Sequence, residues 1–159
     1  MNTSLIVMVP LLAFLLLGLK SIVIDVQEHR LPNKLTARLA IYIVVFEVLT
    51  SVVLNEWSHW LPMFQTVTWI FAIFLVIYWP SKNSLGFGDV KFAVPCALII
   101  GWYTPSHWVD FFWISFGCAA VVAGLLWLTR RASRSSAIAF GPFMYVGVLI
   151  VASKAVLSG

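Results

Sequence analysis

The sequence predicts an all-α polytopic membrane protein of about six transmembrane helices, with residues 1–159 forming a single integral-membrane domain. Composition is the first indication, since hydrophobic residues make up 62% of the 159-residue chain and charged residues 10%, with a mean hydropathy of +0.99. Soluble domains carry about 45–50% apolar and about 25% charged residues. The second indication is that the apolar residues fall into six runs of membrane-spanning length. Together they exclude a soluble enzyme, a disordered tail and a secreted disulfide scaffold.

In chain order, we expect the spans at residues 5–24, 36–54, 61–79, 88–103, 109–129 and 140–157. The first run has no basic segment before it and no small-residue cleavage site after it, so it is predicted to be a permanent helix rather than a signal peptide. The fourth run is short, because the apolar stretch from Phe92 to Tyr103 has only 12 residues. It covers about 18 Å of a roughly 30 Å hydrocarbon core. The fourth helix must therefore begin near Gly88, or be continued by a re-entrant segment.

The basic residues predict the orientation. Nine of the ten lie in or beside the connections that follow spans one, three and five: Lys20, Arg30, Lys34, Arg38, Lys82, Lys91, Arg130, Arg131 and Arg134. The connections at 55–60 and 104–108 contain none, and Lys154 is the exception. Because basic loops favour the cytoplasm, we predict that both termini lie outside. In this orientation an outer aromatic belt is formed by Trp57, Trp60, Trp102 and Trp108. An inner aromatic belt is formed by Trp79 and Trp127.

Two of the six acidic residues, Asp25 and Asp89, stand at the cytoplasmic ends of predicted spans. A charged group at the bilayer edge is costly and usually faces the bundle interior or a water-filled cavity. One interpretation makes each aspartate a topology anchor, paired with a nearby basic residue: Lys91 for Asp89, and Lys20 or Arg30 for Asp25. The other brings the two aspartates together, one carboxylate acting as general base and the other, protonated, as general acid. Such a pair can hydrolyse a peptide bond without a metal or a covalent intermediate.

Gly86 and Gly88 precede Asp89 directly and favour the second interpretation. Glycine permits backbone conformations that other residues resist, and it allows another chain to approach closely. A glycine-rich segment that is not helical can also satisfy the backbone groups of a peptide substrate at membrane depth. The plainer interpretation is a flexible loop before a helix.

Three segments together resemble the prepilin peptidases, the type IV leader peptidase family. Residues 25–33 (DVQEHRLPN) are similar to the segment that opens with the first catalytic aspartate of the family and ends in a basic residue, an aliphatic residue, Pro and Asn. Residues 86–91 (GFGDVK) match the Gly-x-Gly-Asp-x-Lys box of the second aspartate, and residues 140–143 (FGPF) resemble the start of the last helix. Their order, spacing and side of the membrane agree with the family.

The resemblance implies an aspartic endopeptidase in the cytoplasmic (inner) membrane of a prokaryote, with Asp25 and Asp89 as the catalytic pair and no metal or cofactor. Its substrates would be prepilins or pseudopilins, cut after a glycine between the basic leader and the hydrophobic helix at the cytoplasmic face. Membrane lipid is the other expected partner, and nucleic acid is not one. The FGPF stretch favours a bacterial source. The pilus system, the oligomeric state and the assignment of acid and base to the two aspartates stay open.

One departure from the resemblance concerns cysteines. Many bacterial members carry an N-terminal extension with two Cys-x-x-Cys pairs, which is associated with N-methylation of the mature pilin. Here no extension precedes the first span, and Cys96 and Cys118 are far apart within apolar runs. We therefore expect peptidase activity without methyltransferase activity.

Other polar residues have structural and functional interpretations. Pro32 and Asn33 are expected to shape the turn into the second span, with Asn33 as its cap, or to contact substrate. Gly141 and Pro142 suit a helix start, and can also form a cavity wall near the aspartates. Lys91 is expected to set topology, to bind anionic headgroups or to steady the charge of an aspartate.

Glu47 lies 11 residues into the second span, about 16 Å deep at helical rise. A carboxyl group at that depth is a functional-site hypothesis by default. The alternative is a protonated glutamic acid that forms a hydrogen bond with a neighbouring helix. Asp110 is expected to cap the fifth span, and His29 to be a solvated loop residue.

Two other kinds of protein fit part of the pattern. In a small transporter, Asp25, Glu47 and Asp89 would form a proton or cation path and Gly86–Gly88 a helix break. No inverted repeat of two three-span halves is visible, which counts against this class. A catalytically idle pilus-assembly subunit would not need both aspartates. A relative of the signal-peptide peptidases would carry a Pro-Ala-Leu tripeptide, which this sequence lacks.

Overall fold

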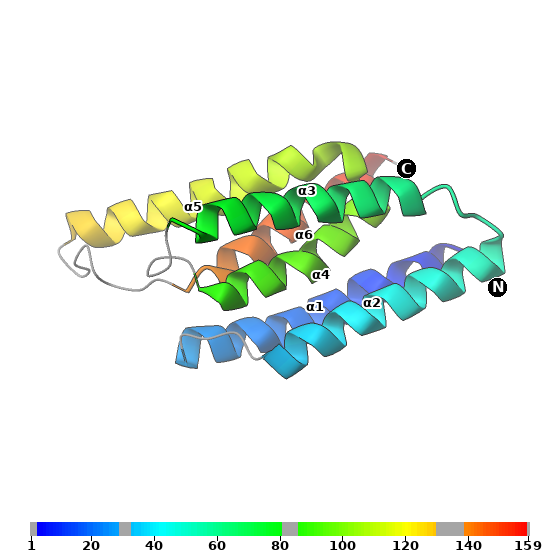
Figure 1. Cartoon of the computed structure of the whole chain (residues 1–159), viewed down its shortest axis with the longest axis horizontal. Coiled ribbons are helices and arrows are strands. Elements are labelled where there is room, and N and C mark those ends of the chain that lie inside the picture. Colours follow the sequence, from blue (N-terminus) through cyan, green and yellow to red (C-terminus); the bar gives the residue numbers. More distant parts are fainter. Residues whose placement is uncertain (1–2, 29–32, 81–85, 130–138, 159) are drawn as a thin grey trace.

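A computed structural model describes residues 3–28, 33–80, 86–129 and 139–158 of the chain. Over these ranges the secondary structure is entirely helical. The elements are α1 (Thr3–Glu28), α2 (Asn33–Leu54), α3 (Trp60–Tyr78), α4 (Phe87–Tyr103), the 3-10 helix η1 (Pro105–His107), α5 (Trp108–Leu128) and α6 (Gly141–Ser158). The six long helices run side by side along the length of the molecule (Figure 1). The predicted all-α class is confirmed.

Each long helix coincides with one predicted span, and the ends differ by at most four residues. Within the described parts of the chain, four stretches are long and apolar enough to cross a membrane: Met8–Gln27, Asn33–Leu54, Trp60–Tyr78 and Pro105–Leu128. The Gly141–Lys154 part of α6 is apolar but shorter, and α4 has 17 residues. The chain is thus an all-α polytopic membrane protein.

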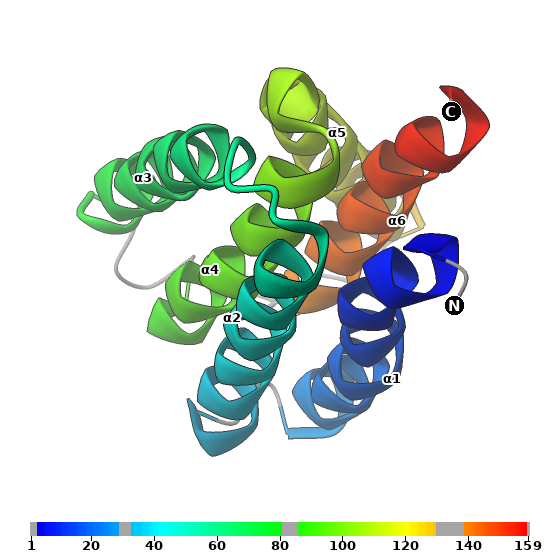
Figure 2. The ribbon, with the colours of Figure 1, turned by 90° about the vertical axis from the view of Figure 1, so that its right-hand side faces the viewer.

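The short helix α4 occupies the centre of the bundle. It packs against α3, α2, α6 and α1, and it lies between α3 and the α1–α2 pair in both views (Figures 1 and 2). Twelve of its residues, between Asp89 and Trp102, are buried. A helix that is apolar on all sides belongs in a core, where protein rather than lipid surrounds it. This position explains why the fourth apolar run is shorter than the others.

Close helix packing requires glycine at two points. A Cβ atom on Gly101 would lie 2.7 Å from the Cα of Met63, so α4 approaches α3 too closely for any side chain there. A Cβ atom on Gly147 of α6 would overlap the hydroxyl of Ser115 on α5. Small residues at such contacts are typical of helices that associate within membranes.

The two ends of the bundle differ in content. Both termini lie at one end, which we call the terminal end (Figure 1). The C-terminal end of α1 and the starts of α2 and α4 lie at the other, which we call the aspartate end. Three tryptophans of the predicted outer belt, Trp57, Trp60 and Trp102, gather at the terminal end, with ring centroids of neighbours 6.1–6.2 Å apart. The assignment of these ends to the outside and the cytoplasm stays a prediction.

Lys154, the exception to the basic pattern, has a local partner at the terminal end. Its Nζ lies 2.6 Å from Oδ2 of Asp110, which is also 2.9 Å from Nδ1 of His107. These contacts link α5 to α6. The expectation that Asp110 caps the fifth span was wrong, because α5 begins two residues earlier at Trp108 and its N-cap position is His107.

Candidate active site

Asp25 reaches the bundle interior because it continues the buried stripe of α1. The stripe runs through Phe14, Gly18, Ser21 and Ile22, at the spacing of one helix face. α1 extends to Glu28, so Asp25 stands in regular helix near its end rather than in the following loop. The side chain is only 4% exposed. The apolar packing of α1 therefore holds a carboxyl group inside the aspartate end.

Asp89 is held at the start of α4 by reciprocal hydrogen bonds with Gly86. The Asp89 amide donates to the Gly86 carbonyl over 3.0 Å, and the Gly86 amide donates to Asp89 Oδ2 over 3.2 Å. This is the arrangement of a capping box, in which a carboxylate satisfies an amide that the helix leaves unpaired. The residue is 9% exposed. The same bonds that begin the helix thus fix the carboxyl group.

The fold brings the two aspartates together. They are 64 positions apart in the sequence, on helices α1 and α4 that pack against each other. Asp25 is near enough for its charge to influence the Asp89 carboxyl group. The alternative in which Asp89 is a topology anchor bound to Lys91 is not supported, because these two described residues form no ion pair with each other.

Lys91 instead joins α4 to α2. Its Nζ donates a hydrogen bond to Oδ1 of Asn33 over 3.0 Å and lies 4.8 Å from the ring centroid of Phe87. The expectation that Asn33 caps the second helix was wrong, because Asn33 is the first residue inside α2 and its side chain bonds across to α4. The sequence did not indicate this link, since the two residues stand 58 positions apart.

The remaining predicted site residues are placed as follows. Gly86 has φ −71° and ψ 144°, an extended conformation open to any residue, so the expected need for glycine's backbone freedom was wrong there. Gly88 lies inside the first turn of α4. Gly141 and Pro142 begin α6, as predicted. Pro32, like Arg30 and His29, lies outside the described residues.

Phe140, in the FGPF stretch, belongs to an aromatic cluster. Its ring centroid is 4.8 Å from that of Phe116 and 6.2 Å from that of Phe74. The stretch therefore packs the start of α6 against α5 and α3.

Glu47 is fully buried in α2, away from the aspartates. Neither of its carboxyl oxygens has a hydrogen-bond partner among the described residues, so the expected bond to a neighbouring helix is not found there. The group interacts electrostatically with Tyr103 at the end of α4, whose hydroxyl is in hydrogen-bonding contact with the Leu11 backbone of α1. The carboxyl group thus lies where α1, α2 and α4 meet near the terminal end.

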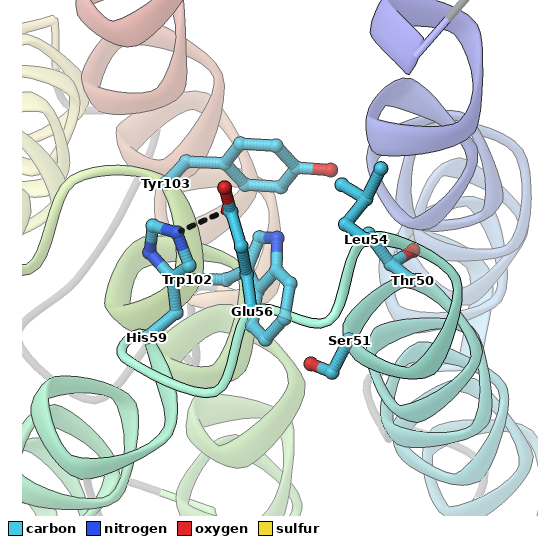
Figure 3. A pocket seen from close by; sticks show the side chains of 7 residues that line it. All are labelled: Thr50, Ser51, Leu54, Glu56, His59, Trp102 and Tyr103. Carbon is cyan, nitrogen blue, oxygen red and sulfur yellow. Dashed lines mark ion pairs between the residues drawn. The ribbon is translucent and has the colours of Figure 1, made fainter.

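A pocket of about 160 Å³ opens at the terminal end (Figure 3). Its lining comes from the end of α2, the following loop and the end of α4: Thr50, Ser51, Leu54, Glu56, His59, Trp102 and Tyr103. Glu56 and His59, both in that loop, form an ion pair of 3.8 Å. The pocket contains neither aspartate, so it is separate from the candidate active site.

The fold and the site define an integral-membrane protein in which a helical bundle buries two interacting carboxyl groups at one end. Residues 10–128 match the Type IV leader peptidase family. Since this match covers more than half of the chain, the chain belongs to that family.

A curated relative agrees with the family. The chain is similar to Leader peptidase HopD of Escherichia coli, with 35% identity over 96 residues. The similarity covers 56% of this chain and 59% of that protein, so the chain spans less than two thirds of the relative's length. No solved structure gives a significant match.

Proposed function

We propose that this chain is a membrane aspartic endopeptidase that removes the leader peptide from prepilins or pseudopilins. The observation that carries the proposal is that Asp25 and Asp89 are both buried at one end of the bundle, where the charge of one carboxyl group influences the other. Family membership and the similarity to a leader peptidase support the same chemistry. The basic residues beside this end favour a cytoplasmic position for it and offer sites for anionic lipid headgroups.

The proposed chemistry needs only the two carboxyl groups and one water molecule. One carboxylate accepts a proton from the water, whose oxygen attacks the carbonyl carbon of the scissile peptide bond. The other, protonated, stabilises the carbonyl oxygen as it gains charge. The C–N bond then breaks, and the leaving nitrogen takes up a proton. Two carboxyl groups that share a site seldom ionise together, which keeps one proton available.

Co-expression with a tagged prepilin in a host without its own prepilin peptidase tests the proposal. Wild type, Asp25→Asn and Asp89→Asn would be compared at matched membrane levels, with Glu56→Gln at the terminal end as a matched acid-to-amide control. We expect leader removal by the wild type and the control, with a new N-terminus directly after a glycine by mass spectrometry. Cleavage that survives either aspartate substitution would remove that residue from the pair.

A further inference from the structure

An apolar groove runs from the aspartate end into the membrane region beside α4. Its volume is about 240 Å³. It is lined mainly by Ala37 and Ala40 of α2, Phe71 of α3, and Phe87, Lys91 and Val94 of α4. We call this feature the α2–α4 groove. It lies between α2 and α3, which both pack on α4 but hardly touch each other; the ribbons of α2 and α3 stand on different sides of α4 in Figure 2.

Three of the lining residues lie furthest along their helices from the aspartate end. Ala40 is seven residues from the start of α2, Val94 is seven from the start of α4, and Phe71 is seven from the end of α3. At helical rise this is about 10 Å, or two turns. The lining of the groove therefore extends about two turns along each of the three helices.

The walls of the groove suit another helix. Ala37 and Ala40 leave room for a second backbone to approach α2 closely, as small residues do between membrane helices. Phe71, Phe87 and Val94 offer apolar surface to side chains that project from such a helix. Lys91, the charged group of the lining, is held by Asn33 and the Phe87 ring at the entrance.

The groove and the aspartates lie on different faces of α4. Phe87 and Lys91 are two residues before and after Asp89, and a separation of two residues turns a helix by about 200°. A chain seated in the groove must therefore pass around the first turn of α4 to reach the carboxyl groups. Gly86 and Gly88, at that turn, carry no side chain. Since the backbone at Gly86 does not itself require glycine, the absence of a side chain is what the position contributes.

We propose that the transmembrane helix of the substrate docks its first two turns in the α2–α4 groove, and that its scissile segment crosses the first turn of α4 over Gly86 and Gly88. The inference rests on the proposed function, in which cleavage falls just before the hydrophobic helix. A bond at that point would lie level with Asp25 and Asp89. Apolar packing in the groove holds the helix, while the chain before it stays extended for attack.

Substitution in the groove tests this docking. Ala40→Phe fills the groove, whereas Ala72→Phe adds the same bulk to an exposed position of α3 outside it. We expect Ala40→Phe to lower prepilin cleavage by about tenfold or more, as overpacking of a contact does. Ala72→Phe is expected to cleave like the wild type. Equal cleavage by the two variants would overturn the docking site.

Disulfide cross-linking gives a readout that does not depend on activity. In the Asp25→Asn background with Cys118→Ala, cysteine would replace Ala40 or Ala72, and single cysteines would be placed along the substrate helix. We expect oxidation to link position 40 to the first two turns of the substrate helix and position 72 to none. Links at 72 but not at 40 would overturn the docking site. A wild-type chain that cleaves no prepilin would overturn the proposed function, and the docking of a substrate with it.

Discussion

Lys91 of α4 donates a hydrogen bond from Nζ to Oδ1 of Asn33 in α2, over 3.0 Å. The bond joins two helices at the entrance of the α2–α4 groove, on a different face of α4 from Asp89. We expect the two side chains to act as a unit. In a double-mutant cycle of Asn33→Ala and Lys91→Met, measured by thermal unfolding in detergent, we expect a coupling free energy of about 0.5–1.5 kcal/mol between the two side chains.

A control cycle pairs Lys91→Met with Thr68→Val. Thr68 is on α3 and its hydroxyl bonds the Phe64 carbonyl of its own helix. The changes in the free energy of unfolding caused by these two substitutions should add. Additive effects in the Asn33–Lys91 cycle would show that the hydrogen bond contributes nothing to the packing of α2 on α4.

Gly86→Ala separates folding from substrate passage. The backbone at Gly86 is open to any residue, and a Cβ atom would lie 3.4 Å from Asp89 Oδ2, an ordinary contact. We expect the free energy of unfolding to change by no more than about 0.5 kcal/mol. The rate of prepilin cleavage should fall by about tenfold or more, because the added methyl group lies in the path of the substrate. Gly117→Ala is the control, since nothing lies within 4 Å of its Cβ position. Unchanged cleavage by Gly86→Ala would contradict the path over α4.

Gly101→Ala should destabilise the bundle. Its Cβ atom would lie 2.7 Å from the Met63 Cα, which is backbone and cannot rotate away. We expect a loss of about 1–3 kcal/mol in the free energy of unfolding, measured by thermal unfolding of the purified protein. Gly124→Ala, with no atom near its Cβ position, should not destabilise. Equal stability of the two variants would show that α3 and α4 can separate at little cost.

Glu47→Leu tests whether the deep carboxyl group has a function. A buried polar group without a hydrogen bond costs about 1–3 kcal/mol, and neither oxygen of Glu47 has such a partner among the described residues. Replacement by leucine should therefore leave stability unchanged or raise it, and cleavage should continue, because the group lies away from the aspartates. Loss of cleavage in a stably folded Glu47→Leu protein would give the carboxyl group a role that the proposed mechanism omits.

The sequence predicted the helices well because apolar runs bounded by polar connections leave a membrane chain few alternatives. Asp25 and Asp89 could be singled out because acids at span ends are costly. Contacts between helices could not be predicted, since apolar periodicity does not say which faces meet. The central position of α4, the Asn33–Lys91 bond and the groove all depend on such pairings. Asp110 was misassigned because α5 begins at Trp108, so that its N-cap position is His107. The contact of Asp110 with Lys154 on another helix could not be predicted either.

Cleavage of a purified prepilin by the chain in lipid nanodiscs tests the central claim most directly. We expect the cleavage rate to fall to the same background value in Asp25→Asn, in Asp89→Asn and in the double variant. The effects of the two substitutions do not add, because both carboxyl groups serve one reaction. Glu56→Gln should retain wild-type kcat/KM. Cleavage by either single variant well above the rate of the double variant would contradict a mechanism that requires both aspartates.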